Sequence, residues 1–244
     1  MGIPVGVIGY RGRMGSEACA AIEADEDLEL AARVGRGDSL DSLSACAVAV
    51  ELTTPDAVGG NVRHLIDAGI HGVVGTSGLT PDDLGVLDEE ARRREVRVLV
   101  APNFALGAVV MMTLAAKAAP YFQSAEIVER HHARKVDAPS GTSLRTAQLM
   151  NAARLNPWDA GSGGDESVSG ARGGDADGIR IHSLRMSGSV AHQEVILGGT
   201  GETLTIRHDS LDRSSFMPGI LLAVKRVASL PPGVAVGLEH LLDL

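Results

Sequence analysis

Several kinds of residue are scarce in this sequence, and each scarcity argues against a class of protein. The chain has only 2 cysteines, Cys19 and Cys46, which do not form a metal-like spacing, so we expect a reduced, cytoplasmic setting in which each behaves as a small buried hydrophobe. Aromatic residues make up 2%, too few for platforms that stack single-stranded nucleic acid, and the formal net charge of -9 argues against any nucleic-acid partner. No apolar run reaches transmembrane length and no signal-peptide pattern is present, so no membrane association is expected.

The residues that are abundant indicate an ordinary globular protein. Hydrophobic residues make up 44% and charged residues 22%. With so few aromatics, the core must be built from Val, Leu, Ile and Ala. A length of 244 residues allows one large domain or two small ones.

The first part of the chain alternates between short apolar runs and helical patterns. Strands are predicted over 3–8, 28–34, 47–52, 71–78 and 96–104, and helices over 12–24, 56–69 and 80–95. The last of these helices has Thr80 at its N-cap, Pro81 in its first position and acids in its first turn. Strands separated by helices imply βαβ units, and therefore a parallel sheet covered by helices on both faces.

The pattern then changes. Helices are predicted over 107–119 and 141–155, and strands over 124–132, 179–186, 191–199 and 202–210. Residues 161–178 are rich in Gly, Ser and Asp and are predicted to form a mobile or ligand-ordered loop. Successive strands without intervening helices indicate an antiparallel or mixed sheet. A final apolar helix is predicted over 216–230.

The segment GYRGRMG places glycines at 9, 12 and 15, where the first strand ends and the first helix begins. At that point a dinucleotide pyrophosphate lies on the free N–H groups of the helix and the positive end of its dipole. The alternative is that the glycines serve only a tight chain reversal.

The tip of the second strand offers a test of cofactor preference. An acid normally binds the ribose there, but the tip is Val34-Gly35-Arg36-Gly37, and Asp38 is the only acid nearby. Without a carboxylate to repel a 2′-phosphate, and with Arg36 able to pair with one, the pattern favours acceptance of NADPH. The alternative is that Arg33 and Arg36 are solvated surface residues.

Two further loops are predicted at the carboxyl edge of the same sheet. GTSG (75–78) ends the fourth strand and APNF (101–104) ends the fifth. Their small hydroxyl and amide groups suit the nicotinamide carboxamide and ribose, because ligands bind at this edge of open α/β sheets. Ordinary turn chemistry would select the same residue types.

The stretch ERHHARKVDAPSGT (129–142) concentrates basic residues in an acidic chain. It can be a solvated loop, a metal site or an anion site. Adjacent histidines on a strand point to opposite faces, so His131 and His132 cannot easily share one metal ion. For an anion, Lys135, the Thr142 hydroxyl and the N–H groups of Gly141 and Thr142 would converge where a helix begins.

At this stretch the sequence resembles a known family. ERHHARKVDAPSGTS is similar to the signature E-x-HH-x-x-K-x-DAPSGT of the 4-hydroxy-tetrahydrodipicolinate reductases, also called dihydrodipicolinate reductases. GYRGRMG resembles the family's glycine loop, VVGTSG its GTTG motif and APNFALG its NF-x-x-G motif. Residues 170–210 resemble its C-terminal sheet, especially in actinobacterial members. The long signature is highly specific, and the resemblance covers nearly the whole chain.

The resemblance implies a reaction and a set of site residues. The reaction is delivery of a hydride from NADPH or NADH to a dicarboxylate ring, the dehydrated form of 4-hydroxy-tetrahydrodipicolinate, in the diaminopimelate route to lysine. His131 would donate or accept the proton, with Lys135 as the partner acid. Substrate contacts would fall on His132, Lys135, Ser140, Gly141 and Thr142. Cofactor contacts would fall on Gly9, Tyr10, Arg11, Gly12, Arg13, Met14, Gly75, Thr76, Ser77, Ala101, Pro102, Asn103 and Phe104, joined by Arg36 from the charge argument. No metal is expected.

The chemistry of these residue types agrees with that reaction. Adding hydride to a conjugated imine builds negative charge that must be protonated, and a histidine with a pKa of about 6.5 can supply the proton. A nearby ammonium stabilises the developing charge.

Three positions depart from the family pattern. Gly35 stands where several members carry an acid, which argues against a preference for NADH. Glu51-Leu52 replaces a frequent Asp-Phe, with only a packing consequence expected. Ser77 replaces the usual Thr.

We therefore expect an α/β chain in two domains: a Rossmann-like cofactor domain over 1–103, completed by a return over 215–244, and an α+β substrate and oligomerisation domain over 104–214 with a mixed, open sheet. Family members are homotetramers joined through that sheet, and the apolar alternation over 191–206 fits a buried face. Closure is expected about hinges near 103–107 and 213–216. Two rivals are a dehydrogenase of another small amino or imino acid and a nucleotide-sensing regulator without turnover.

Overall fold

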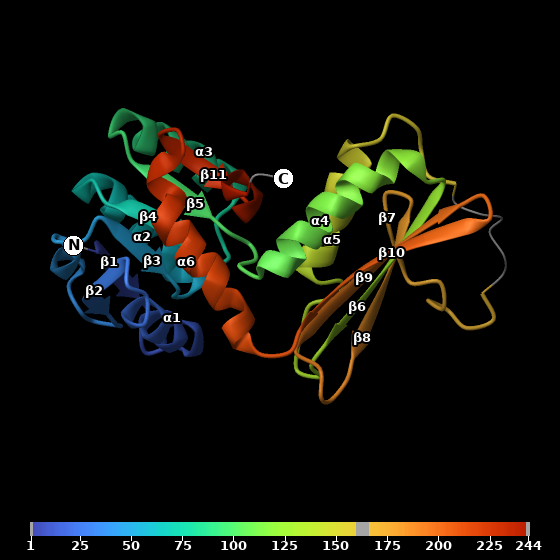
Figure 1. The fold of residues 1–244 in the computed structure, drawn as a ribbon, viewed down its shortest axis with the longest axis horizontal. Coiled ribbons are helices and arrows are strands. Elements are labelled where there is room, and N and C mark those ends of the chain that lie inside the picture. The colour runs from blue at the N-terminus through green and yellow to red at the C-terminus, as the bar shows by residue number, and fades with distance from the viewer. Residues whose placement is uncertain (1, 160–165, 243–244) are drawn as a thin grey trace. The chain divides into compact units, whose positions relative to one another are not determined.

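Two compact units make up the chain in the computed structural model, which describes residues 2–159 and 166–242 (Figure 1). The first unit comprises the chain up to Leu106 together with the chain from Arg213 onward, and the second comprises Gly107–Asp212. The expected domain limits, after 103 and before 215, lie close to these.

The sheet of the first unit is entirely parallel. Its strands are β1 (Ile3–Ile8), β2 (Leu28–Val34), β3 (Val48–Glu51), β4 (His71–Val74), β5 (Arg97–Val100) and β11 (Gly233–Val236), in the order β11-β5-β4-β3-β1-β2. The order reverses between β1 and β3, as it does in doubly wound folds. The predicted Rossmann-like sheet is confirmed.

Four α-helices cover this sheet: α1 (Arg13–Glu23), α2 (Pro55–Ala68), α3 (Pro81–Arg93) and α6 (Met217–Arg226). Because strand crossovers are right-handed, the reversal of strand order sends α1 and α2 to opposite faces. The α2 and α3 helices share one core cluster with the sheet, formed by Val58, Val62, Ile66, Val74, Leu87, Ala91, Val96 and Val98. A capping box between Thr80 and Asp83 fixes the start of α3, as its sequence predicts.

Three local expectations were wrong. The strands predicted over 71–78 and 96–104 end earlier, at Val74 and Val100, because Gly, Ser and Pro follow and form the loops at the edge of the sheet. The helix predicted over 216–230 ends at Arg226 and continues as the 3₁₀ turn Val227–Ser229. Strand β11 was missed, because four residues are too few to show a period.

The second unit contains a mixed five-stranded sheet, as predicted. Its strands are β6 (Ser124–His131), β7 (Gly174–Ala176), β8 (Ile179–Arg185), β9 (Ala191–Gly199) and β10 (Glu202–Ser210), in the order β10-β9-β6-β8-β7. The β6–β8 pair is parallel and the other pairs are antiparallel. The two α-helices labelled beside this sheet are α4 (Leu106–Ala118) and α5 (Gly141–Ala152) (Figure 1).

The apolar face of this sheet packs under helices of the same chain. Val195 and Leu197 of β9 are fully buried, and Gln193 on the same face bonds the hydroxyls of Ser143 and Thr146 in α5. Part of the apolar alternation over 191–206 is thus buried within one chain, whereas Leu204 on the same face is exposed, and the expected assembly through this sheet stays a prediction. The opposite face carries charged side chains, among them Glu126, Arg130, Arg180, His182, Glu194, Arg207 and Asp209.

The segment predicted as a mobile or ligand-ordered loop, 161–178, lies partly outside the described residues, since 161–165 are not among them. Its described part forms turns and strand β7. The Glu166 carboxylate accepts hydrogen bonds from the backbone N–H groups of Gly170 and Arg172, at 2.7 and 3.1 Å.

Within the described ranges, none of the helices combines the length and apolar character needed to span a bilayer. Both cysteines are free and buried, as expected, and burial raises the pKa of each thiol. Across the same residues, no group of three His, Cys, Asp or Glu side chains is arranged to hold a metal ion.

Candidate active site

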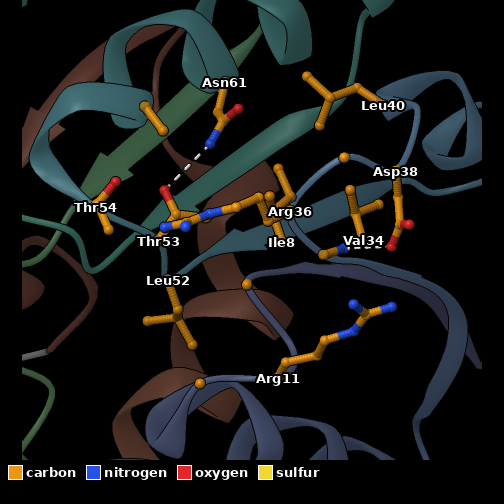
Figure 2. A pocket seen from close by; sticks show the side chains of 15 residues that line it. Ile8, Arg11, Val34, Arg36, Asp38, Leu40, Leu52, Thr53, Thr54 and Asn61 are labelled. Carbon is orange, nitrogen blue, oxygen red and sulfur yellow. Dashed lines mark hydrogen bonds between the residues drawn. The ribbon is translucent and has the colours of Figure 1, made fainter.

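A cavity of about 510 Å³ opens at the carboxyl ends of β1, β2 and β3 (Figure 2). This is the point of strand-order reversal, where ligands bind in open α/β sheets. Its lining comprises Ile8, Gly9, Arg11, Gly12, Val34, Gly35, Arg36, Gly37, Asp38, Leu40, Leu52, Thr53, Thr54, Ala57 and Asn61. Four predicted cofactor residues are among them: Gly9, Arg11, Gly12 and Arg36.

The glycine loop has a physical need for its glycines. Gly9 has a φ of +89°, and a Cβ there would lie 2.2 Å from the Leu52 carbonyl oxygen. A Cβ at Gly15 would lie 2.2 Å from the Gly9 carbonyl oxygen. The chain can therefore turn this tightly into α1 only with glycine at both positions.

Helix α1 begins without a side-chain cap. Its N-cap is Gly12, which has no side chain to accept a hydrogen bond from the first N–H groups of the helix. The first turn also contains no acid. The uncapped N–H groups and the positive end of the helix dipole adjoin the cavity, with Arg13 and Met14 in the first turn. These features fit the diphosphate of a dinucleotide.

The far end of the cavity is shaped by the turn at 35–38. The Asp38 carboxylate accepts a hydrogen bond from the Gly35 N–H at 2.8 Å. Tyr10 and Arg11 approach Gly35 so closely that a Cβ there would lie 3.2 Å from both side chains. The Arg11 Nε donates to the Tyr10 hydroxyl at 2.9 Å.

Two arginines enter this cavity and a third does not. Figure 2 shows the Arg36 side chain running across the cavity toward Thr53, with Arg11 and Asp38 on another side. Arg33 instead forms an ion pair with Glu23, and is absent from the lining. Of the two arginines singled out in the sequence, only Arg36 is placed to meet a ligand here.

Sequence reasoning missed one wall of the cavity, formed by Leu52, Thr53, Thr54 and Asn61. Behind this wall lies Glu51, whose carboxylate is 0% exposed. Its Oε1 accepts hydrogen bonds from the Thr53 hydroxyl and, at 3.0 Å, from Asn61 Nδ2. The Glu51 carboxylate therefore holds two lining residues in place, a role that was not expected from the sequence. The sequence signal that could have indicated this role is an acid at the end of an otherwise apolar strand.

The loops after β4 and β5 meet the same edge of the sheet without lining this cavity. Thr76 Oγ1 accepts a hydrogen bond from the Thr53 N–H at 2.7 Å, which joins the loop at 75–78 to the cavity wall. Gly75 packs so closely that a Cβ would lie 2.7 Å from both Leu52 and Phe104. Asn103 Oδ1 accepts from the Ala105 N–H at 2.8 Å. Ser77 and Pro102 are exposed, whereas Ala101 and Phe104 are buried.

The second group of predicted residues lies in the other unit, at one end of β6. That strand ends at His131, the chain turns through 132–140, and α5 starts at Gly141. Ser140 is the N-cap of α5, and its hydroxyl accepts a hydrogen bond from the Ser143 N–H at 3.2 Å. Gly141 and Thr142 form the start of the first turn, where the helix dipole is positive. The Ser140 N–H donates to the carboxylate of Glu129 on β6 at 3.2 Å, which ties this helix start to the end of the strand.

A buried carboxylate organises this end of the sheet. Glu129 is 0% exposed and binds Arg185 through two hydrogen bonds of 2.8 and 2.9 Å. Its Oε2 also accepts from His131 Nδ1 at 2.5 Å, and its Oε1 accepts from the Ser140 N–H at 3.2 Å. Neither Glu129 nor Arg185 was predicted as a site residue. The signal for Glu129 was its alternation with Ala125 and Ile127 on the buried face of β6.

The remaining predicted residues lie in the loop. Lys135 Nζ contacts both carboxylate oxygens of Asp137, at 2.7 and 2.8 Å, and its side chain is 22% exposed. His132 is exposed. The hydrogen bonds from Lys135 hold the pKa of the Asp137 carboxyl below its usual range. Lys135 thus already binds one carboxylate in this structure, although not the one we expected.

The two titrating groups of the network have shifted pKa values. Burial opposes ionisation of Glu129, but hydrogen bonds from Arg185, Ser183 and His131 outweigh it and lower its pKa. Burial lowers the pKa of His131, Glu129 acts against this, and the positive charges of Lys135 and Arg185 lower it further. The ring is therefore easily deprotonated, while its proton on Nδ1 is held by Glu129.

Two protein-family models match the chain. The model described as dihydrodipicolinate reductase, N-terminus, matches residues 3–104, and the model described as dihydrodipicolinate reductase, C-terminus, matches residues 107–242.

The chain belongs to the dihydrodipicolinate reductase family. The resemblance inferred from the motifs is thereby confirmed. A 4-hydroxy-tetrahydrodipicolinate reductase of Streptomyces avermitilis is 54% identical, with 98% of each chain covered. One of Thermobifida fusca is 52% identical over 99% of this chain and 100% of its own. A dipicolinate-bound dihydrodipicolinate reductase from Paenisporosarcina sp. TG-14 has a TM-score of 0.90 at 36% identity, covering 99% of this chain and 100% of its own.

Proposed function

We propose that this chain reduces the dehydrated form of 4-hydroxy-tetrahydrodipicolinate to tetrahydrodipicolinate with NADPH or NADH, in the diaminopimelate route to lysine. The observation that carries the proposal is the gathering of His131, Lys135 and the start of α5 around one end of β6, in a chain of the reductase family. Relatives that are 50–54% identical bear the name of this reductase. The two alternative functions, a dehydrogenase of another small amino or imino acid and a nucleotide-sensing regulator, have no comparable support.

The cofactor proposal rests on the cavity at the strand-order reversal. Gly9, Gly12 and the first turn of α1, with Arg13 and Met14, would hold the diphosphate. Arg36, Arg11 and Asp38 would surround the adenosine ribose, and Gly75–Ser77 with Ala101–Phe104 would hold the nicotinamide end. A bound reduced nicotinamide supplies the hydride of the reaction.

Cofactor preference depends on the balance of charge at the ribose end. Asp38 bonds the Gly35 N–H, while Arg36 crosses the cavity and Arg11 flanks the same turn. Two guanidinium groups against one carboxylate favour a 2′-phosphate. We therefore propose that the enzyme accepts both cofactors and uses NADPH better.

The substrate is a dianion, and the chain offers cations and helix amides to bind it. Lys135 would exchange Asp137 for one substrate carboxylate, assisted by His132, and the first turn of α5 at Gly141 and Thr142 would bind the other. Ser140 contributes by capping that helix. Residues 104–214 then form the substrate domain, and closure about 103–107 and 213–216 remains a prediction.

His131 is proposed as the proton donor. Glu129 holds Nδ1–H, so the second ring nitrogen, Nε2, is the atom that can carry a proton to the substrate. Hydride addition leaves negative charge on the conjugated imine. The protonated ring, which carries a proton on both nitrogens, neutralises this charge by transferring its Nε2 proton, and the neutral ring that remains keeps Nδ1–H on Glu129. Lys135 stabilises that charge as it develops.

The test is loss of nicotinamide absorbance with freshly prepared substrate, run separately with NADPH and NADH. Replacing His131 or Lys135 with alanine is expected to lower turnover by about a hundredfold or more, which is the usual contribution of a proton donor or charge stabiliser. Cofactor affinity, measured by fluorescence of the bound reduced cofactor, should stay within about twofold of the wild type. Collapse of both quantities together would count against these roles, and turnover of a different imino acid in preference would count against the substrate.

The second sheet also offers a surface for assembly. We propose a cytoplasmic homotetramer that associates through the second sheet, whose charged face is not covered by α4 or α5. Light scattering after gel filtration would give the mass directly, and a monomer at micromolar concentration would contradict the tetramer.

A further inference from the structure

One buried carboxylate contacts three parts of the proposed substrate site. Glu129 on β6 accepts hydrogen bonds from His131 on the same strand, from Arg185 at the end of β8, and from the backbone of Ser140 at the start of α5. All four acceptor directions of the carboxylate are occupied by these contacts. Both carboxylate oxygens of Glu129 accept hydrogen bonds from site residues, which a side chain with only a packing role would not need.

Arg185 extends this arrangement into the loop that carries Lys135. Its Nη2 donates to the Asp137 carbonyl oxygen at 2.6 Å as well as to Glu129. Asp137 in turn is the residue whose carboxylate binds Lys135. The guanidinium therefore connects the buried acid to the loop over 132–140.

The geometry explains why both partners are charged. A carboxylate without exposure is costly unless it is paired and hydrogen-bonded, and two parallel N–H···O bonds from one arginine satisfy it with a fixed orientation. An arginine and an acid held rigidly in this way can orient a third group, here the imidazole of His131.

We propose that Glu129 and Arg185 are positioning residues of the reductase. Glu129 holds His131 in the tautomer that carries a proton on Nδ1, so that Nε2 faces the substrate, and Arg185 holds the Lys135 loop through the Asp137 carbonyl. The proposal rests on the proposed function for the role of Nε2, but the tautomer of His131 is a property of the protein alone.

The charged groups that face His131 come from three places. Glu129 lies on its own strand, Arg185 lies on the paired strand β8, and Lys135 lies in the following loop. On the other neighbouring strand, β9, the residue paired with His131 is Ala191. Glu129 is the single negative charge in this set, so its loss disfavours the protonated ring.

The first experiment uses Glu129→Gln and nitrogen NMR of histidine-labelled protein, with the His131 signals assigned from a His131→Asn variant. In the variant the Gln oxygen is expected to stay at the Oε1 position, where Arg185 Nη2 and the Ser140 N–H both donate. Its NH₂ group then faces His131 Nδ1, which becomes an acceptor. We expect wild-type His131 in the Nδ1–H form at neutral pH and the variant in the Nε2–H form. An unchanged tautomer would overturn the role of Glu129, whether or not the protein is a reductase.

The second experiment measures the pH dependence of kcat in the same variant. We expect kcat at pH 7 to fall by about ten- to a hundredfold, and its decline with rising pH to begin at lower pH, because the protonated imidazole is less populated. An unchanged pH profile in a variant with an altered tautomer would show that Glu129 does not act on the reaction. Absence of turnover in the wild type would instead contradict the proposed function and leave the NMR result standing.

A matched control is available on the same strand. Glu126 also joins an arginine and a histidine, Arg172 and His182, at 2.8 Å each, but it lies on the other face of β6. Glu126→Gln removes the same charge from a more exposed setting, since the Glu126 side chain is 41% exposed. It should leave the His131 tautomer and the pH profile unchanged, and an equal change in both variants would refute a specific role for Glu129.

Arg185→Lys tests the second half of the proposal and serves if Glu129→Gln does not fold. It keeps the charge but loses the paired hydrogen bonds. We expect dipicolinate to bind about tenfold more weakly by calorimetry, with His131 still in the Nδ1–H form. Arg172→Lys is the control, and equal dipicolinate affinity in Arg185→Lys and wild type would overturn the role of Arg185.

Discussion

The two halves of the proposed site are built by opposite means. The cofactor cavity is shaped by backbone, with glycines at 9, 12 and 35 allowing close approach and a helix N-terminus supplying polarity. The end of β6 is shaped by charged side chains, with Glu129 buried between Arg185 and His131. We therefore expect the cofactor cavity to be sensitive to substitutions that add atoms, and the end of β6 to be sensitive to substitutions that remove a charge.

The largest effect is expected from adding one carbon to the backbone-built half. Gly9→Ala places a Cβ 2.2 Å from the Leu52 carbonyl oxygen at a φ of +89°. We expect cofactor affinity to fall about a hundredfold and the free energy of unfolding to fall by about 1–3 kcal/mol, by fluorescence titration and urea denaturation.

Gly60→Ala is the control for this change. Gly60 lies in α2, and a Cβ there meets no atom within 4 Å. It should raise the free energy of unfolding by about 0.5–1 kcal/mol, since alanine is the better helix former. Similar losses in both variants would show that the glycine loop is not specially constrained.

Reversing one charge in the cofactor cavity tests whether the Arg36 side chain sets the choice between NADPH and NADH. Arg36→Asp is expected to lower the ratio of NADPH to NADH use, expressed as kcat/KM, by roughly tenfold or more, because a carboxylate repels a 2′-phosphate. Arg33→Gln, which also removes a positive charge near the tip of β2, should leave the ratio unchanged. A constant ratio in both variants would exclude Arg36 from phosphate recognition.

A smaller effect is expected at Glu51, the buried acid of the backbone-built half. Glu51→Leu leaves the Thr53 hydroxyl without its acceptor and Asn61 Nδ2 with only the Thr53 hydroxyl oxygen, at a cost of about 1–3 kcal/mol in the free energy of unfolding. Cofactor affinity should weaken about threefold to tenfold as these two lining residues reorient. Glu51→Gln keeps an acceptor oxygen and should recover most of both losses, and failure to do so would mean that the charge itself matters.

The smallest expected effect is the pH dependence of stability, which compares one histidine from each of the two units. His71 in the first unit and His131 in the second both have pKa values lowered chiefly by burial, with Arg97 adding to the effect at His71. The unfolded chain therefore binds protons more readily than the folded chain as the pH falls through the unfolded value of about 6.5, and stability falls with it.

The lowered pKa of Glu129 acts in the same direction at lower pH, where its stabilising contribution is lost as the carboxylate is protonated. Thermal denaturation between about pH 7 and 4 should show a steady fall of Tm that is reduced in His71→Gln and in His131→Asn. A Tm that stays constant over this window would contradict both histidine shifts.

The same contrast explains what the sequence allowed us to predict. Gly9, Gly12 and Gly15 stand together in the chain, so their spacing, with the apolar run before them and the helical pattern after them, places the loop between a strand and a helix. The strand–helix alternation fixes the sheet because each element buries a face of known period. Strand β11 lacks such a period, and the ends of β4 and β5 depend on turns that are shorter than the pattern resolves.

The charged half was only partly predictable. His131, Lys135 and the start of α5 lie within one motif, and the roles that the resemblance implies for them stay predictions. Arg185 reaches Glu129 only because β6 and β8 pair in parallel, and no local pattern encodes that pairing. The partner of Lys135 was also missed, because the pairing with Asp137 depends on the shape of the loop.

Strand β11 has a consequence for how the chain is made. It pairs with β5, from Gly233 against Arg97 to Val236 against Val100, although the whole second unit is translated between them. During synthesis from the N-terminus, β5 therefore remains an unprotected sheet edge until β11 has been made. The nascent protein completes its second unit first and its first unit last, so truncation of a few C-terminal elements would leave the earlier-made sheet open to aggregation.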